Sequence, residues 1–132
     1  MNLNELAKEA HQIAVDHGWW SPEPSFGDLV ALMHSELSEA LEEYRAGNPN
    51  VWYACMQDGL PCDKETCEAY GKGHCSGLEV EEKPEGIAVE LADCIIRILD
   101  WAGKEGVDME SIIKEKMAYN RTRPYRHGGK LL

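Results

Sequence analysis

Two short acidic stretches decide the fold and the candidate site of this chain. Residues 35–43 read SELSEALEE, and residues 90–93 read ELAD. In each stretch two carboxylates stand three residues apart among apolar residues, so on a helix both members of a pair share one face. Two such helices packed side by side would bring four carboxylates across one groove. These four are Glu36, Glu39, Glu90 and Asp93.

Four carboxylates this close repel one another strongly unless cations lie between them. Hard oxygen ligands of this kind suit Mg²⁺ or Mn²⁺ and do not suit zinc. The alternative is that the acids lie on solvated faces of acidic helices, which is the common use of a single such pair. Two pairs on two helices favour the metal site.

Apolar residues at helical spacing predict four helices along the chain. The first runs over about residues 4–17, after Asn2, and the second follows an N-cap at Ser25 and ends at Gly47. The third has Pro84 in its first turn, and the fourth is capped by Asp108. Strand signals are close to absent. The sequence therefore predicts one all-α domain over residues 1–132, a four-helix bundle or an intertwined helical dimer, with a basic tail at 120–132.

Residues 48–83 lack any sustained period, which predicts an irregular, cysteine-rich insert with at most one short helical turn. Its four cysteines could close a structural zinc site, either as four thiolates or as three with His74. Free thiols and a disulfide remain the alternatives, since the spacing is wider than in a C-x-x-C knuckle. Cys94 is expected to be a small buried apolar residue of the third helix. The insert cysteines are Cys55, Cys62, Cys67 and Cys75.

The formal net charge of −11 excludes several classes of partner. Nonspecific binding to a nucleic acid polymer or an anionic membrane requires a basic face. A phosphate-bearing ligand stays possible when divalent cations lie between it and the carboxylates. The chain has neither a membrane span nor the pattern of a signal peptide, which predicts a cytoplasmic protein.

Together with residues 116–125, KMAYNRTRPY, the two acidic stretches resemble the MazG-like, all-α nucleoside triphosphate pyrophosphohydrolases, a superfamily that includes dimeric dUTPases and dCTP pyrophosphatases. The resemblance covers residues 25–47 and 84–130. It implies Mg²⁺-dependent hydrolysis of a (d)NTP to the monophosphate and pyrophosphate, and a homodimer or tetramer. The chain departs from the pattern at Ser35, where the family has an acid, and in the 50 residues between Glu39 and Glu90, which imply an elaborated loop.

The resemblance also implies roles for particular residues. The four carboxylates would hold the metal, and Glu39 would in addition orient or deprotonate the attacking water. Lys116, Asn120 and Arg123 would bind the substrate, although basic residues at a helix C-terminus commonly serve only to complement the helix dipole. Four aromatic residues are candidates for stacking a base, with core packing or a dimer contact as the alternative: Trp19, Trp20, Trp52 and Tyr53.

A second function from another class is a catalytically silent helical module that binds nucleotide or a protein partner as a regulator. The complete set of four carboxylates favours the enzyme, because a silent module does not require it.

Overall fold

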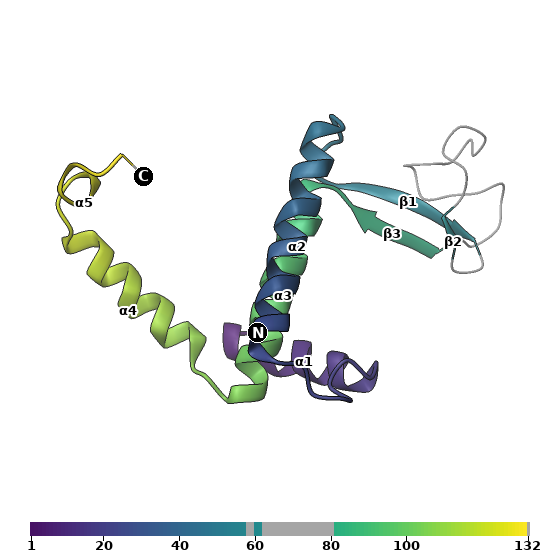
Figure 1. The fold of residues 1–132 in the computed structure, drawn as a ribbon, viewed down its shortest axis with the longest axis horizontal. Coiled ribbons are helices and arrows are strands. Elements are labelled where there is room, and N and C mark those ends of the chain that lie inside the picture. The colour runs from purple at the N-terminus through teal and green to yellow at the C-terminus, as the bar shows by residue number, and fades with distance from the viewer. Residues whose placement is uncertain (58–59, 62–80, 132) are drawn as a thin grey trace. The chain divides into compact units, whose positions relative to one another are not determined.

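The computed structural model describes residues 1–57, 60–61 and 81–131, and this part of the chain is mostly helical (Figure 1). The predominantly α-helical class predicted from the sequence is confirmed. No helix in the described ranges is long and apolar enough to cross a bilayer. The elements in chain order are α1 (Leu3–Asp16), α2 (Phe26–Arg45), β1 (Trp52–Gln57), β2 (Leu60–Pro61), β3 (Glu81–Glu85), α3 (Ile87–Glu105), α4 (Met109–Thr122) and α5 (Arg126–Gly129).

The predicted N-caps of three helices are present. The Asn2 side chain accepts a hydrogen bond from the backbone N–H of Glu5, whose carboxylate in turn accepts one from the Asn2 backbone. Ser25 forms the same reciprocal capping box with the third residue of α2. Asp108 caps α4. Each cap satisfies a backbone donor that the first turn of a helix leaves free, which explains why these helices begin where the sequence predicts.

The third helix begins later than predicted, because Pro84 lies in a strand. α3 starts at Ile87, and Pro84 is paired with Tyr53 across the β1–β3 ladder. β3 is at an edge of the sheet, whose strand order is β2-β1-β3. An edge strand accommodates proline because one side of it needs no backbone donor. The placement of Pro84 in the first helical turn was therefore wrong.

The interpretation of residues 48–83 as irregular was also wrong where the chain is described. β1 and β3 form an antiparallel ladder from Trp52↔Glu85 to Met56↔Glu81. The sequence of β3, EEKPE, has little strand propensity of its own. Its extended form is supported by the backbone hydrogen bonds to β1, a cross-strand effect that propensity and periodicity do not report.

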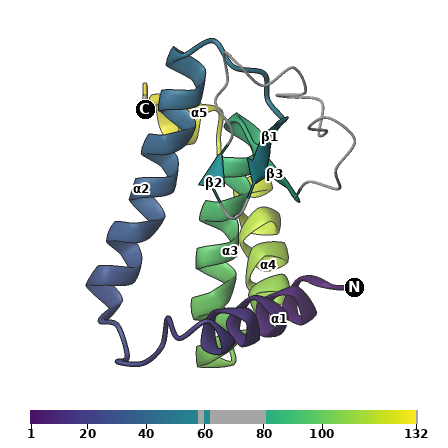
Figure 2. The same ribbon diagram turned by 90° about the vertical axis from the view of Figure 1, so that its right-hand side faces the viewer.

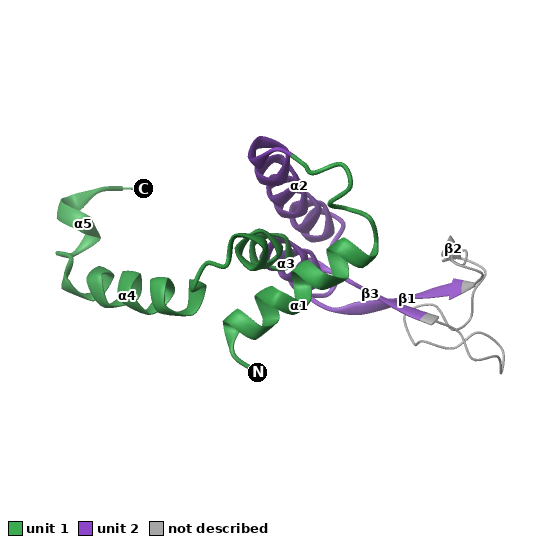
Figure 3. Ribbon diagram, turned by 90° about the horizontal axis from the view of Figure 1, so that it is seen from below, with its two compact units in different colours: residues 1–24, 96–132 green, residues 25–95 purple. Residues whose placement is uncertain are grey.

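By backbone contacts the chain divides into two compact units, with the boundary inside α3 (Figure 3). Unit 1 comprises residues 1–24 and 96–132, and unit 2 comprises residues 25–95. The core of unit 1 is formed by Ala7, Leu99 and Ala102. A Cβ on Gly103 would lie 2.2 Å from the Ala7 carbonyl oxygen, so α1 crosses α3 at a point that requires glycine. The single domain over residues 1–132 stays a prediction.

Unit 2 contains α2, the three strands and the first half of α3. Its strands leave the ends of the two helices as an extended arm, which we define as β1 and β3 (Figure 1). Figure 2 views this arm along its length. At the base of this arm the backbone N–H of Ala88 donates to the carbonyl oxygen of Asn50 at 2.9 Å. Gly86 has a φ of +115°, and a Cβ there would lie 2.6 Å from the same Asn50 oxygen. The start of α3 is thus held directly against the segment that follows α2.

Candidate metal centre

The acidic residues singled out in the sequence gather in unit 2. α2 carries Glu36 and Glu39 one turn apart, and α3 carries Glu90 in its first turn. One carboxylate oxygen from each of these three residues lies within 4.8 Å of the other two. Glu36 and Glu90 are buried, at 6% and 7% exposed, whereas Glu39 is exposed. The structure therefore brings three of the four predicted ligands together; we call these three residues the acidic cluster.

Asp93 lies at the border of the acidic cluster. It follows Glu90 by three residues on α3 and is half-buried. Its oxygens are outside the 4.8 Å group, but its negative charge acts on Glu90 and raises the pKa of that carboxyl. Asp93 is thus close enough to interact with the cluster electrostatically.

The fold raises the pKa of the Glu90 carboxyl from 4.5 to about 7. Burial is the largest cause, followed by a hydrogen bond with the Glu39 carboxyl and by the negative charges of Glu39, Asp93 and Glu85. A hydrogen bond between two carboxyl groups requires a proton on one of them. Near neutral pH the cluster therefore relieves its repulsion by holding a proton, and a divalent cation would relieve the same repulsion. Carboxylate oxygens so arranged fit Mg²⁺ or Mn²⁺.

Glu43, one turn beyond Glu39, serves a different purpose. Its Oε2 atom accepts hydrogen bonds from the Asn48 side-chain amide and from the Trp52 indole, each at 2.9 Å. These contacts join the end of α2 to the first residue of β1. Glu43 therefore anchors the arm.

The arm adds two charged residues beside the cluster that the sequence interpretation did not find. In β3 the Lys83 ammonium lies 2.5 Å from Glu85 Oε1. The hydrogen bond that Lys83 donates to Glu85 is the main cause that raises the pKa of Lys83, and the charges of Glu85, Glu90 and Asp93 add to it. In the sequence, the one indication that these two residues lie near the cluster is their position a few residues before Glu90. It could be used only once residues 81–85 were known to form a strand.

The three predicted substrate-binding residues belong to unit 1. Lys116 and Asn120 lie on α4 and are exposed, and Arg123 is its half-buried C-cap. Tyr119, which the sequence interpretation did not select, lies between the two cations. The Lys116 Nζ atom is 4.8 Å from the centre of its ring, and the Arg123 Cζ atom is 6.0 Å away. Cation–π contact with one ring holds both charges on the same part of α4.

Basic residues also surround an open pocket at the end of the described chain. The pocket has a volume of about 460 Å³ and includes Arg123. Arg123 therefore shares this pocket with other basic residues of the tail, all within unit 1. The other lining residues are Arg126, His127, Lys130 and Leu131.

Two of the four aromatic candidates for base stacking use their ring N–H on carboxylates. The Trp20 indole donates to Asp100 Oδ1 at 2.9 Å, and His11 Nδ1 lies 2.8 Å from the same oxygen. Trp52 donates to Glu43, as described above. Trp19 is 73% exposed and Tyr53 is 42% exposed. Trp20 thus holds the segment after α1 onto α3, and Trp52 joins the start of β1 to α2.

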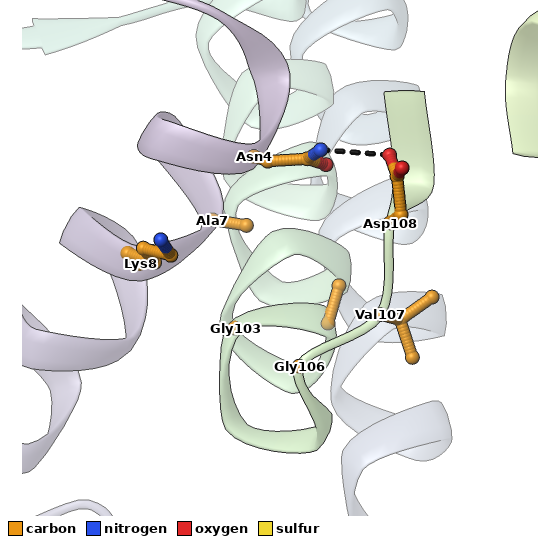
Figure 4. A pocket seen from close by; sticks show the side chains of 8 residues that line it. Asn4, Ala7, Lys8, Gly103, Gly106, Val107 and Asp108 are labelled. Carbon is orange, nitrogen blue, oxygen red and sulfur yellow. Dashed lines mark hydrogen bonds between the residues drawn. The ribbon is translucent and has the colours of Figure 1, made fainter. Parts of the chain in front are cut away.

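A second pocket in unit 1 lies between α1 and the α3–α4 turn (Figure 4). Its volume is about 230 Å³. The Asn4 side chain donates across it to Asp108 Oδ1 at 2.7 Å, as the dashed line in Figure 4 shows. Because Asp108 already caps α4, this bond fastens the start of α4 to α1.

Two of the five cysteines lie in described segments. Cys55 in β1 is fully buried, and Cys94 on α3 is 7% exposed, as expected for a small apolar residue. The zinc hypothesis combines Cys55 with three further insert cysteines, or any three of the four with His74. Cys62, Cys67, His74 and Cys75 lie outside the described residues.

Comparison of the chain with models of protein families, with curated proteins and with solved structures finds no match in any of the three.

Proposed function

We propose that this chain is a Mg²⁺-dependent nucleoside triphosphate pyrophosphohydrolase that converts a (d)NTP to the (d)NMP and pyrophosphate. The observation that carries the proposal is the acidic cluster of Glu36, Glu39 and Glu90, with oxygens within 4.8 Å of one another. Two of its members are buried. Buried carboxylates are rare unless they are paired with a cation or hold a proton.

The donor set fits a hard divalent cation, which Glu36, Glu39, Glu90 and Asp93 would hold. When bound, Mg²⁺ neutralises phosphate oxygens and lowers the pKa of a coordinated water. Glu39 is the exposed member of the cluster, so it is the one that solvent and substrate can reach. We assign Glu39 to orienting the attacking water and accepting its proton. Glu36 and Glu90 would supply ligand oxygens from inside the fold, Glu90 after the loss of its proton.

We also propose that the fold is a MazG-like four-helix bundle into which the arm is inserted. The support is the order of the motifs: E-x-x-E on α2, E-x-x-D on α3 and the Lys…Asn…Arg segment on α4. In this proposal Lys116, Asn120 and Arg123 bind substrate phosphates or the sugar. A homodimer or tetramer is consistent with α4, of which no residue is buried and on which Ile112 and Met117 are about half exposed.

A panel assay tests the function. The protein is incubated with Mg²⁺ and each of the common and several damaged nucleoside triphosphates, and pyrophosphate and monophosphate are measured. We expect release from at least one substrate, lost in EDTA and reduced at least 100-fold in Glu39→Gln. Glu42→Gln is the matched control, because Glu42 lies on the same helix and pairs with Arg45 at 3.2 Å. Binding of a nucleotide without release from any triphosphate would support the regulatory module instead.

A further inference from the structure

The arm brings one cation to the edge of the acidic cluster. Lys83 and Glu85 stand two residues apart in β3, so both side chains point to the same face of the strand. Their ion pair has a length of 2.5 Å. The Lys83 side chain is 58% exposed, whereas that of Glu85 is 18% exposed. Glu85 is therefore the more buried member of the ion pair, and Lys83 is the member exposed to solvent.

The backbone on which Lys83 stands is fixed relative to both helices that carry the cluster. Lys83 is paired with Ala54 of β1, which is 2% exposed. β1 is tied to α2 through the bond from Trp52 to Glu43. β3 runs into α3 with only Gly86 between them. The arm thus holds Lys83 four residues before the start of α3, on a backbone that is tied to both helices.

The charges around Lys83 connect it with the cluster. Besides Glu85, the carboxylates of Glu90 and Asp93 act on its ammonium group. An exposed ion pair is weak because water screens it, so Lys83 can exchange Glu85 for a partner of higher charge. A lysine carries three donors on a flexible stem and suits a phosphate oxygen.

We propose that Lys83 is a substrate-binding residue that contacts the phosphate chain of the nucleotide. A phosphate chain approaching Glu39 and Glu90 meets negative charge, and Lys83 is an exposed cation on the strand that leads directly into the helix of Glu90. The inference rests on the proposed function, since it takes a polyphosphate as the ligand. It gives the arm a role, because the strand would supply a contact to the phosphate chain.

The test uses inorganic tripolyphosphate and Mn²⁺ with the full chain, so that hydrolysis is not the readout. Lys83→Met should weaken binding of Mn²⁺–tripolyphosphate about 10- to 100-fold, as expected for loss of a charge-assisted contact. Its affinity for Mn²⁺ alone, followed by electron paramagnetic resonance, should be unchanged or higher, because a positive charge near the ligands is removed. Lys114→Met is the matched control, since Lys114 forms an ion pair of the same length with Glu110.

Glu85→Gln should not weaken tripolyphosphate binding, in contrast to Lys83→Met. It releases Lys83 from its partner without removing the ammonium, so tripolyphosphate should bind equally or up to about 5-fold more tightly. Lys83→Arg should keep most of the affinity. Equal tripolyphosphate binding by wild type and Lys83→Met, or no binding by the wild type, would overturn the inference. The inference would also be overturned if Lys83→Met lost affinity for Mn²⁺ and for tripolyphosphate to the same extent, because that result would indicate a structural role for Lys83.

The same variants in the nucleotide assay separate this inference from the proposed function. If the wild type hydrolyses a triphosphate and Lys83→Met keeps its kcat and KM, the inference fails and the function stands. If the wild type hydrolyses no triphosphate but Lys83→Met binds tripolyphosphate more weakly than the wild type, the proposed function fails and the phosphate contact of Lys83 stands.

Discussion

Replacing Glu90 with glutamine should stabilise the metal-free protein at alkaline pH. The carboxyl of Glu90 has a pKa of about 7 in the fold against an ordinary value of 4.5. An acid whose pKa is raised by folding favours the native state below pH 4.5 and loses that contribution as pH rises through 7. The full displacement corresponds to about 3 kcal/mol. Water and salt around the exposed Glu39 screen part of the repulsion, so we expect about 1–3 kcal/mol.

Urea unfolding in EDTA at pH 5 and pH 8 measures this effect. Glu90→Gln and wild type should have similar free energies of unfolding at pH 5, and the variant should be the more stable at pH 8. Saturating Mg²⁺ at pH 8 should reduce or reverse this difference in the free energy of unfolding, because only the wild type retains all the carboxylates that would bind the metal. Glu110→Gln is a control of opposite sign, since its hydrogen bond to Lys114 lowers the pKa of Glu110. A difference that is the same at both pH values would refute the reasoning.

Three further predictions follow from the same unit. Asp93→Asn should raise the Mg²⁺ concentration needed for activity without lowering the melting temperature in EDTA, whereas a large loss of melting temperature would make Asp93 structural. Gly86→Ala should cost about 2–4 kcal/mol in urea unfolding, because its Cβ would lie 2.6 Å from a backbone oxygen at a φ of +115°. The control is Gly47→Ala, where φ is +72° and a Cβ would meet open space, so we expect a cost of about 1 kcal/mol. A loss of stability in Gly47→Ala as large as that in Gly86→Ala would contradict the steric argument. Trp52→Phe should cost about 1–3 kcal/mol by leaving Glu43 without its indole donor, and an unchanged urea midpoint would contradict the anchoring role.

The helices were predictable because their signals are local. A capping residue lies within three positions of the backbone group it satisfies, and an apolar stripe repeats within one turn. For this reason Asn2, Ser25 and Asp108 mark helix starts in the sequence as they do in the structure. The convergence of Glu36, Glu39 and Glu90 could be predicted only together with the assumption that two helices pack side by side.

The arm could not be predicted, because its cause is not local. Residues 81–85 form a strand through pairing with residues 52–56, about 30 positions earlier in the chain. Pro84 argued for a helix start by its own preferences and is instead accommodated at a sheet edge. Lys83 and Glu85 were missed for the same reason, since their position beside Glu90 depends on this pairing.

The contact between Asn50 and Gly86 has a consequence for how the chain can vary in length. At that crossing the segment after α2 meets the residue before α3, so the helices that carry Glu39 and Glu90 are joined there whatever the number of residues between β1 and β3. The entropic free-energy cost of closing a loop rises only slowly with loop length, by about 0.6 kcal/mol for each doubling. Additions or deletions between the strands would therefore leave the junction of α2 and α3 at this crossing as it is.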